Sequence, residues 1–243
     1  MSLNGILWLA HFFFPRECVH CGVLLDFRNR DYLCAGCRAL LKPMEEPVCE
    51  RCGVPPEIPA RNPAPCPDCR DCPPAYRRAR SALFFSGPGG SLVRAYKYSS
   101  NPYLAGACLR LLLAGGDRWY DWEKYDRVVP VPLHPRKTRE RGFDQAVVLA
   151  AGLTRKTGIP LDRKSLVRIR YTGTQTRLDR KARMENIQGA FLVTGEDRVR
   201  GASILLIDDV HTTGATVNEC AETLMKAGAE NVDVLTLARA VNR

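Results

Sequence analysis

Two adjacent carboxylates and a hydroxyl-rich loop form the segment of this chain with the clearest chemical potential. The apolar run Ile204–Ile207 precedes Asp208 and Asp209, and a loop of small residues that contains Gly214 follows them. The loop residues are Thr212, Thr213, Gly214, Ala215 and Thr216. When such a loop opens directly into a helix, backbone N–H groups and threonine hydroxyls converge on one point and can hold a phosphate dianion. Gly214 lets the backbone approach that phosphate closely. We expect the carboxylates to lie beside it, where they can accept hydrogen bonds from ribose hydroxyls and stabilise positive charge on the sugar ring.

Two other interpretations of this segment compete with phosphate binding. A Walker B strand also ends in acidic residues, but the chain contains no G-x-x-x-x-G-K-[ST] sequence to accompany it. The segment can also be an ordinary strand-to-helix turn with a threonine cap. Binding of a phosphorylated ribose is the prediction that we prefer for this segment.

A second chemical feature is a set of four cysteine pairs near the start of the chain. Nine of the eleven cysteines lie between Cys18 and Cys72, and eight of these nine form C-x-x-C pairs. The pairs are Cys18 with Cys21, Cys34 with Cys37, Cys49 with Cys52, and Cys66 with Cys69. Each pair places two thiolates on one tight turn, and two such turns about a dozen residues apart can close a tetrahedral site. Sequential pairing predicts two closed, structural zinc sites, which supply folding free energy to a segment with few large apolar side chains.

Other roles for these cysteines stay open at this point. Disulfides are disfavoured without a secretory signal. The run Cys66-x2-Cys69-x2-Cys72 is also typical of an iron–sulfur cluster, and Cys72 could replace Cys69 as a zinc ligand. A redox-sensing role is a further alternative. The two remaining cysteines, Cys108 and Cys220, sit in apolar helical patterns and are predicted to be small core residues.

The positive charge of the chain is confined to its second part. The formal net charge is +10, but residues 1–75 contribute −1 and residues 76–243 contribute +11. Fourteen of the basic residues fall between His134 and Arg183, against four acidic ones. Such a field attracts a small phosphate ester or a nucleic acid, although a merely soluble basic surface would give the same count.

The elements that must position these groups alternate between strands and helices. Strands are predicted at Ser81–Phe85, Arg127–Val131, Ile204–Ile207 and Val232–Leu237, and helices at Pro102–Leu113, Phe143–Thr157 and Ala215–Lys226. This alternation predicts an α/β fold with a mostly parallel, twisted sheet, in which ligands bind at the carboxyl ends of the strands. We therefore expect a double zinc-ribbon domain over residues 1–75 and an α/β domain over 76–243, with a linker at Tyr76–Arg80.

The segment Ile204–Thr216 resembles the signature of type I phosphoribosyltransferases that binds phosphoribosyl pyrophosphate (PRPP). The whole chain is similar to the ComF family of competence proteins, which joins a double zinc ribbon to a phosphoribosyltransferase domain. Four further segments carry this resemblance: Pro15–Gly22, Val93–Tyr98 with Leu104–Ala105, Val129–Ala146, and Thr174–Phe191. The chain departs from the family pattern at Ser100, where glycine is frequent, and at Asp144, where asparagine is frequent. Ser100 belongs to the loop Lys97–Ser100, which the resemblance implies contacts pyrophosphate.

The resemblance implies a role for each part of the site. The loop Thr212–Thr216 would bind the 5′-phosphate, while Asp208 and Asp209 would hold the ribose hydroxyls directly or through Mg²⁺. Lys97 and Arg141 are the preferred contacts for the pyrophosphate, with Arg136 and Arg139 as further candidates. Tyr171–Met184 has the position of the mobile catalytic loop, with Arg177 and Arg183 as weaker candidates. His134 is interpreted as a structural turn residue, and His211 is assigned no catalytic role.

Two functions follow from these inferences. One is transfer of phosphoribosyl from Mg-PRPP to a nitrogen nucleophile, although no acceptor pocket is recognisable in the sequence. The other is a non-catalytic competence factor that responds to PRPP and handles single-stranded DNA near a helicase or translocase, as membership of the family would imply. The apolar run Ile6–Phe14 is too short to span a membrane and lacks signal-peptide features, so it is predicted to be a short docking helix of a cytoplasmic protein.

Overall fold

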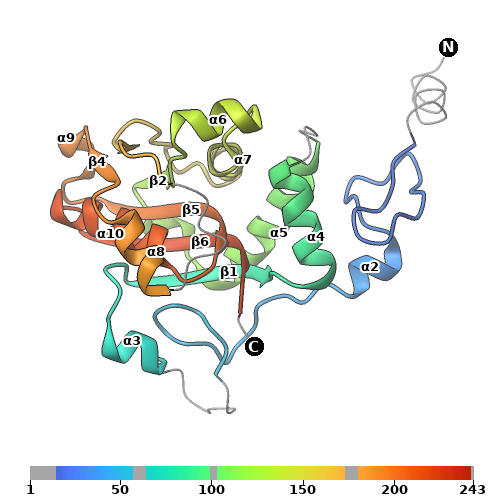
Figure 1. The fold of residues 1–243 in the computed structure, drawn as a ribbon, viewed down its shortest axis with the longest axis horizontal. Coiled ribbons are helices and arrows are strands. Elements are labelled where there is room, and N and C mark those ends of the chain that lie inside the picture. The colour runs from blue at the N-terminus through green and yellow to red at the C-terminus, as the bar shows by residue number, and fades with distance from the viewer. Residues whose placement is uncertain (1–14, 57–63, 99–102, 173–179, 242–243) are drawn as a thin grey trace.

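The sheet at the centre of the protein has four parallel strands. The computed structural model describes residues 15–56, 64–98, 103–172 and 180–241, with only the backbone for 180–183. The strand order is β1 (Arg78–Phe84), β6 (Asn231–Arg239), β5 (Ser203–His211) and β2 (Arg127–Pro130). All three pairings are parallel (Figure 1). The parallel α/β sheet predicted from the sequence is therefore confirmed.

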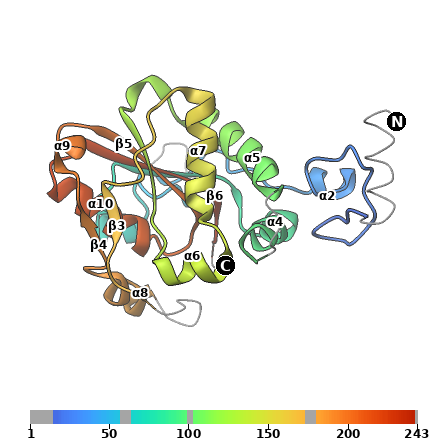
Figure 2. The same ribbon diagram turned by 90° about the horizontal axis from the view of Figure 1, so that it is seen from above.

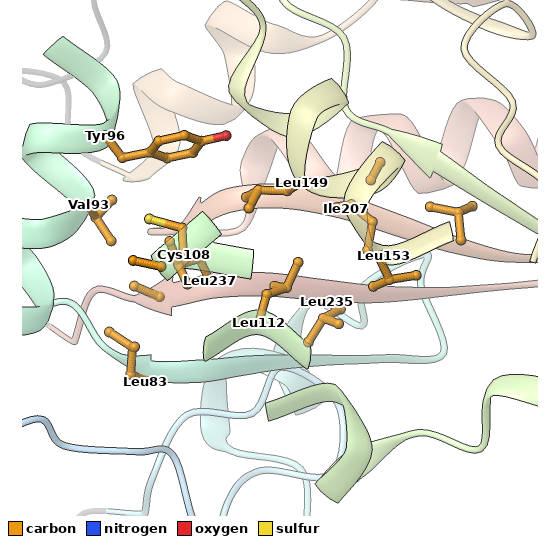
Figure 3. Close-up of a cluster of buried hydrophobic side chains, with 14 of the residues drawn as sticks. Leu83, Val93, Tyr96, Cys108, Leu112, Leu149, Leu153, Ile207, Leu235 and Leu237 are labelled. Atoms are coloured by element: carbon orange, nitrogen blue, oxygen red, sulfur yellow. The ribbon is translucent and has the colours of Figure 1, made fainter. Parts of the chain in front are cut away.

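Successive residues of the central strands point to opposite faces of the sheet, and each face carries its own apolar core. Leu205, Leu235 and Leu237 pack with Cys108 in one core, part of which is drawn in Figure 3. The alternating residues of β5 and β6 pack with Cys220 in the other core. Both cysteines are completely buried, as predicted. Because both faces of the sheet are covered, β5 and β6 contain stretches of successive apolar residues that do not alternate with polar ones.

Different helices cover the two faces. Three helices contribute to the first core: α4 (Gly87–Tyr98), α5 (Leu104–Trp119) and α7 (Gln145–Thr157). On the other face lies α10 (Ala215–Lys226), which packs against α8 (Arg180–Ile187). A separate two-stranded antiparallel sheet, formed by β3 (Leu166–Arg168) and β4 (Phe191–Val193), also adjoins α10. Shorter elements are α6 (Pro135–Arg141), α9 (Glu196–Val199) and the 3-10 helix η1 (Trp122–Lys124).

Several boundaries differ from those predicted. β5 continues four residues beyond Ile207, so that Asp208 and Asp209 lie within the strand, because the pairing with β6 extends to His211. The predicted linker at Tyr76–Arg80 is wrong, since β1 begins at Arg78. Arg77 and Arg78 also donate to the buried carboxylate of Asp233, at 3.0 and 3.4 Å for their Nε atoms. These contacts fix the segment against β6.

Helices α4 and α6, which border the site, were not predicted. Helix α4 begins with a glycine-rich segment, which lacks the apolar periodicity that predicts a helix. Its residues Leu92, Val93 and Tyr96 nevertheless form one buried face, and Gly89 packs tightly against β1. In α6 a proline occupies the first turn, where its missing N–H costs nothing.

Part of the predicted mobile loop Tyr171–Met184 is also helical, because α8 begins at Arg180. Its residues favour helix by propensity although they lack apolar periodicity. Residues 173–179 lie outside the described part of the chain.

The cysteine-rich segment consists of two small units attached to different parts of the α/β domain. The first unit includes α2 (Ala35–Ala39) and lies beside α4 and α5, where Arg110 Nη2 is 2.6 Å from Asp31 Oδ1 (Figure 2). The second includes α3 (Pro67–Asp71) and lies along β1, where Ala79 N donates to Arg51 O at 2.6 Å. Between them, Pro43 pairs in antiparallel fashion with Leu83 at the edge of the sheet. The predicted docking helix Ile6–Phe14 lies outside the described residues.

Candidate functional site

The acidic pair lies next to a lysine from a helix that is far away in the sequence. Asp209 is buried near the carboxyl end of β5, and Lys97 lies in the last turn of α4. Lys97 Nζ is 2.9 Å from Asp209 Oδ1, and the two side chains are 20% and 11% exposed. The structure therefore brings Lys97, predicted to contact pyrophosphate, to the residues predicted to hold the ribose.

The carboxyl group of Asp208 has a raised pKa. Burial, followed by the charge of Asp209, raises the pKa of Asp208 to about 8, although Lys97 opposes the shift. Its Oδ1 accepts a hydrogen bond from the backbone N–H of Asp209 at 2.8 Å. A carboxyl group held protonated near neutral pH is suited to a site where a cation or a developing positive charge arrives later.

The predicted phosphate loop, Thr212–Thr216, joins β5 to α10. Gly214 precedes the first residue of the helix with a φ angle of +83°, a conformation that favours glycine. Ala215 N approaches Thr213 Oγ1 at 3.4 Å. The first turn of an α-helix leaves backbone N–H groups without intrahelical partners. In this protein these N–H groups lie at the start of α10, which follows the strand that carries the acidic pair. The arrangement can hold a phosphate dianion.

Arg141 reaches the same region through a buried glutamine. Its Nη1 donates to Gln145 Oε1 at 3.0 Å, and Gln145 Nε2 in turn approaches the carbonyl oxygen of Lys97 at 3.4 Å. Tyr96 Oη donates to the backbone carbonyl of Gln145 at 2.9 Å. Gln145 is only 1% exposed. Gln145 was not predicted to belong to the site, because no signal in the sequence marks this glutamine as buried.

The other basic candidates separate into several groups. Arg136 Nε is 3.1 Å from Glu140 Oε1 on the exposed face of α6, and Arg139 is also exposed. Lys137, which was not predicted, has its Nζ 6.0 Å from the centre of the Tyr171 ring, and burial followed by the charges of Arg168, Arg141 and Lys97 lowers its pKa. The residues Ser100 and Arg177, and the side chain of Arg183, lie outside the described part of the structure.

Two residues discussed from sequence have structural tasks around α6 and α7. Asp144 caps α7: its Oδ1 accepts from Val147 N at 3.1 Å, and its Oδ2 accepts from Leu133 N at 3.2 Å. An asparagine could form the acceptor part of this cap, which explains how both residue types suit the position. His134 was predicted to be a structural turn residue. Its Nδ1 accepts a hydrogen bond from Arg136 N at 3.2 Å, so its structural role is to cap the start of α6.

The eight paired cysteines gather in two clusters. Within each cluster the sulfur atoms all lie within 4.8 Å of one another, a geometry that fits one tetrahedral metal ion. The first cluster contains Cys18, Cys21, Cys34 and Cys37, and the second contains Cys49, Cys52, Cys66 and Cys69. Cys72 is exposed and lies outside both clusters. This grouping follows the sequential pairing proposed from the sequence.

The two clusters repeat the same backbone design. Gly22 N and Gly53 N donate to the carbonyls of Cys18 and Cys49, both at 2.9 Å, and both glycines have positive φ angles. In the second cluster, a hydrogen bond with the Cys52 thiol and others with backbone amides lower the pKa of Cys49 to about 4, against the effect of burial. A zinc ligand must be a thiolate, so these donors favour metal binding.

Known protein families match both the cysteine-rich segment and the α/β domain. Residues 9–72 match the double zinc ribbon domain, and residues 143–242 match the phosphoribosyl transferase domain. The chain is 31% identical to the DNA utilization protein YhgH of Salmonella typhimurium, over 98% of this chain and 99% of the relative. It is also 31% identical to Competence protein F of Haemophilus influenzae, over 94% of this chain and 99% of the relative. The chain belongs to the ComF family.

The chain is also similar to two further proteins. Competence protein ComFC of Bacillus subtilis is 28% identical over 85% of this chain and 84% of its own. The solved structure of the allosteric regulatory enzyme of purine biosynthesis aligns with 59% of this chain and 30% of its own, at 22% identity and a TM-score of 0.42. The two clusters of four cysteines are the zinc-binding sites of the double ribbon. Every helix in the described ranges is too short or too polar to cross a lipid bilayer.

Proposed function

We propose that this ComF family protein binds Mg-PRPP at the carboxyl end of β5 and transfers its phosphoribosyl group to an acceptor, in association with DNA uptake. The observation that carries the proposal is the position of Lys97, whose Nζ is 2.9 Å from Asp209 beside the phosphate loop. PRPP has a complementary partner there for each of its parts. Helix N–H groups suit its 5′-phosphate, carboxylates suit its ribose hydroxyls, and cations suit its pyrophosphate.

The acidic pair fits the magnesium that PRPP carries. Asp208 has no cation paired with it among the described ion pairs, and burial followed by the charge of Asp209 raises its pKa. Mg²⁺ prefers carboxylate, phosphate and water oxygens, and when bound it neutralises the pyrophosphate. Asp208 and Asp209 would hold it or its water ligands. Lys97 and Arg141 would bind the leaving pyrophosphate, while the carboxylates stabilise positive charge on the ribose ring.

Calorimetric titration tests binding, and a pyrophosphate-release assay tests catalysis. The wild-type protein is expected to bind PRPP in the presence of Mg²⁺, and the Lys97→Met variant to bind it at least about tenfold more weakly, because a charge-assisted contact is lost. Lys124→Met, which removes a lysine paired with Asp121 on the surface, is the matched control and should bind normally. Equal PRPP binding by Lys97→Met and wild type would contradict the proposed site.

Pyrophosphate release decides between the two roles. Release on addition of an acceptor would establish a transferase. Binding without release for any nitrogen nucleophile would favour the second candidate, a PRPP-responsive factor that handles single-stranded DNA.

Exposed aromatic rings beside cations support this second candidate. Tyr98 is 72% exposed, and the Arg141 guanidinium lies 5.6 Å from its ring centre. Tyr171 is 38% exposed and lies beneath Arg136, at 5.0 Å, and near Lys137. Proteins that bind single-stranded nucleic acid combine aromatic rings, which stack on the bases, with cations, which bind the phosphates.

Substitution of these rings gives a direct test of DNA binding. Tyr98→Ala and Tyr171→Ala are each expected to weaken binding of a single-stranded oligonucleotide by about 1–3 kcal/mol, the value of one stacked base. Phe27→Ala is the matched control, because Phe27 also lies near an arginine, Arg28 at 5.1 Å, but belongs to the first zinc ribbon. Fluorescence anisotropy at several salt concentrations would measure the effect. Equal loss in all three variants, or none, would count against this surface.

A further inference from the structure

His211 is a buried residue whose polar atoms are unused. It is the last residue of β5, is 2% exposed, and has no hydrogen-bond partner for Nδ1 or Nε2 within the described part of the chain. Buried polar atoms without partners destabilise a fold, and an apolar ring of similar size would avoid that cost. The presence of histidine here therefore points to a role connected with the adjoining site.

The imidazole lies directly behind the phosphate loop. A Cβ atom placed on Gly214 would be 2.8 Å from His211 Nε2 and 3.6 Å from Tyr76 Oη. The backbone of Gly214, with its positive φ angle, thus rests against the tips of both side chains. This glycine directs the first N–H groups of α10, so any shift of the two rings would move the groups predicted to bind phosphate.

Tyr76 continues the contact from His211 to the second zinc ribbon. Its ring packs edge to face on that of His211, with a centroid distance of 6.3 Å, and it is 3% exposed. Burial and the neighbouring charges of Cys52, Cys69 and Cys49 raise the pKa of Tyr76 above its usual range. The phenol is therefore protonated and lies close to the cysteine cluster.

Hydrogen bonds from the same ribbon hold this arrangement on both sides. Arg51 Nη2 donates to the carbonyl of Tyr76 at 2.9 Å, and Arg239 Nη1 donates to the carbonyl of Cys52 at 2.7 Å. Arg239 is the register partner of His211 in the sheet. Ala75 N donates to Asn218 Oδ1 at 2.7 Å, so the segment that leaves the ribbon also holds the first turns of α10.

We propose that His211 and Tyr76 are positioning residues through which the second zinc ribbon sets the affinity of the phosphate loop for a phosphomonoester. The inference rests on the proposed function, because it takes Thr212–Thr216 as the site of the 5′-phosphate. The first ribbon has no such contact with the loop in the described structure; it reaches the α/β domain through α4 and α5. The two zinc ribbons thus have different tasks.

Two small probes separate this role from general loosening of the protein. Ribose 5-phosphate carries the phosphomonoester, whereas Mg-pyrophosphate engages only the groups around Lys97 and Arg141. Calorimetry on the full-length, zinc-loaded protein would measure both affinities. The wild-type protein is expected to bind both probes. Absence of ribose 5-phosphate binding by the wild type would overturn the proposed function and this inference with it.

Substitutions at His211 test its polar role. His211→Phe keeps a ring but removes both nitrogens, so the unliganded protein should melt at a higher temperature. It should nevertheless bind ribose 5-phosphate roughly tenfold to a hundredfold more weakly, while Mg-pyrophosphate binding stays unchanged. A merely structural residue would not raise the melting temperature and lower affinity together. Unchanged affinity for ribose 5-phosphate in His211→Phe would overturn the role of His211.

Substitutions at Tyr76 test the connection to the ribbon. Tyr76→Ala should weaken ribose 5-phosphate binding selectively, with both zinc ions retained, and Tyr76→Phe should restore it because the ring contact remains. Leu224→Ala is the matched control: it opens a cavity in the same helix, α10, away from the loop. If Leu224→Ala weakened ribose 5-phosphate binding as much as Tyr76→Ala does, the effect would be general destabilisation and the inference would be wrong.

Discussion

Replacing Asp208 by asparagine is expected to abolish PRPP binding and, at the same time, to stabilise the unliganded protein. The side chain keeps its shape but loses its charge. Burial and the neighbouring Asp209 carboxylate raise the pKa of Asp208 to about 8 in the fold. Ionised Asp208 is therefore unfavourable until a cation reaches the site. Residues that serve binding at the expense of stability are common in functional sites.

The pH dependence of this effect follows from the raised pKa. Between about pH 4 and pH 8 the folded protein keeps a proton on Asp208 that the unfolded chain has lost, so the contribution of this group to stability falls as pH rises. Asp208→Asn removes that dependence. The variant should gain about 1–3 kcal/mol at pH 8.5 and little at pH 4. This is less than the full shift implies, because Asp208 is not entirely enclosed.

Asp209→Asn is the matched comparison. Asp209 pairs with Lys97 at 2.9 Å, so the substitution leaves a partly buried ammonium group without its partner. Such a loss destabilises a protein, in contrast to the gain expected at the adjacent position. Both variants should fail to bind PRPP by calorimetry. Denaturant unfolding at the two pH values would measure stability, and a less stable Asp208→Asn protein at pH 8.5 would contradict the electrostatic interpretation.

The strongest parts of the fold and site were predictable because they depend on local sequence. An apolar run followed by Asp208, Asp209 and a Thr/Gly loop predicts a strand, a loop and a helix, and the structure has β5 and α10 there. The cysteine spacing likewise restricts the metal clusters, since a C-x-x-C pair needs only a short turn. The features that the structure confirms, β5 with α10 and the two cysteine clusters, therefore consist of residues close together in the chain.

The missed parts depend on contacts between distant residues. Gln145 connects Arg141 with the backbone of Lys97, but nothing in its neighbourhood marks a glutamine as buried. Tyr76 was assigned to a linker because two prolines precede it, whereas contacts with Arg51 and His211 bury it. His211 was placed in the loop because the apolar run ends at Ile207. Pairing with β6 carries the strand four residues further, which changes the role of its last side chain.

Loss of the second zinc site is expected to destabilise the whole protein. In the Cys52→Ser variant, zinc content should fall from two ions per chain to one, and the main unfolding transition should fall by roughly 10 °C, for a loss of about 3 kcal/mol or more. The reason is the attachment of this ribbon to the sheet. Arg80 Nη1 donates to the Cys49 carbonyl at 3.3 Å, and Arg239 donates to the carbonyl of Cys52. Elemental analysis and calorimetric melting would measure both effects.

Cys72→Ser and Cys21→Ser complete this experiment. Cys72 is exposed and outside the clusters, so its replacement should leave two zinc ions and an unchanged melting temperature. Retention of only one zinc ion by this variant would show that Cys72 is a ligand. Cys21→Ser should also remove one zinc ion but lower the main transition less, because the first ribbon is attached by polar contacts of His20 and Asp31 with helices α4 and α5. Equal destabilisation by Cys21→Ser and Cys52→Ser would mean that the attachment to β1 and β6 does not determine how zinc stabilises the phosphoribosyltransferase domain.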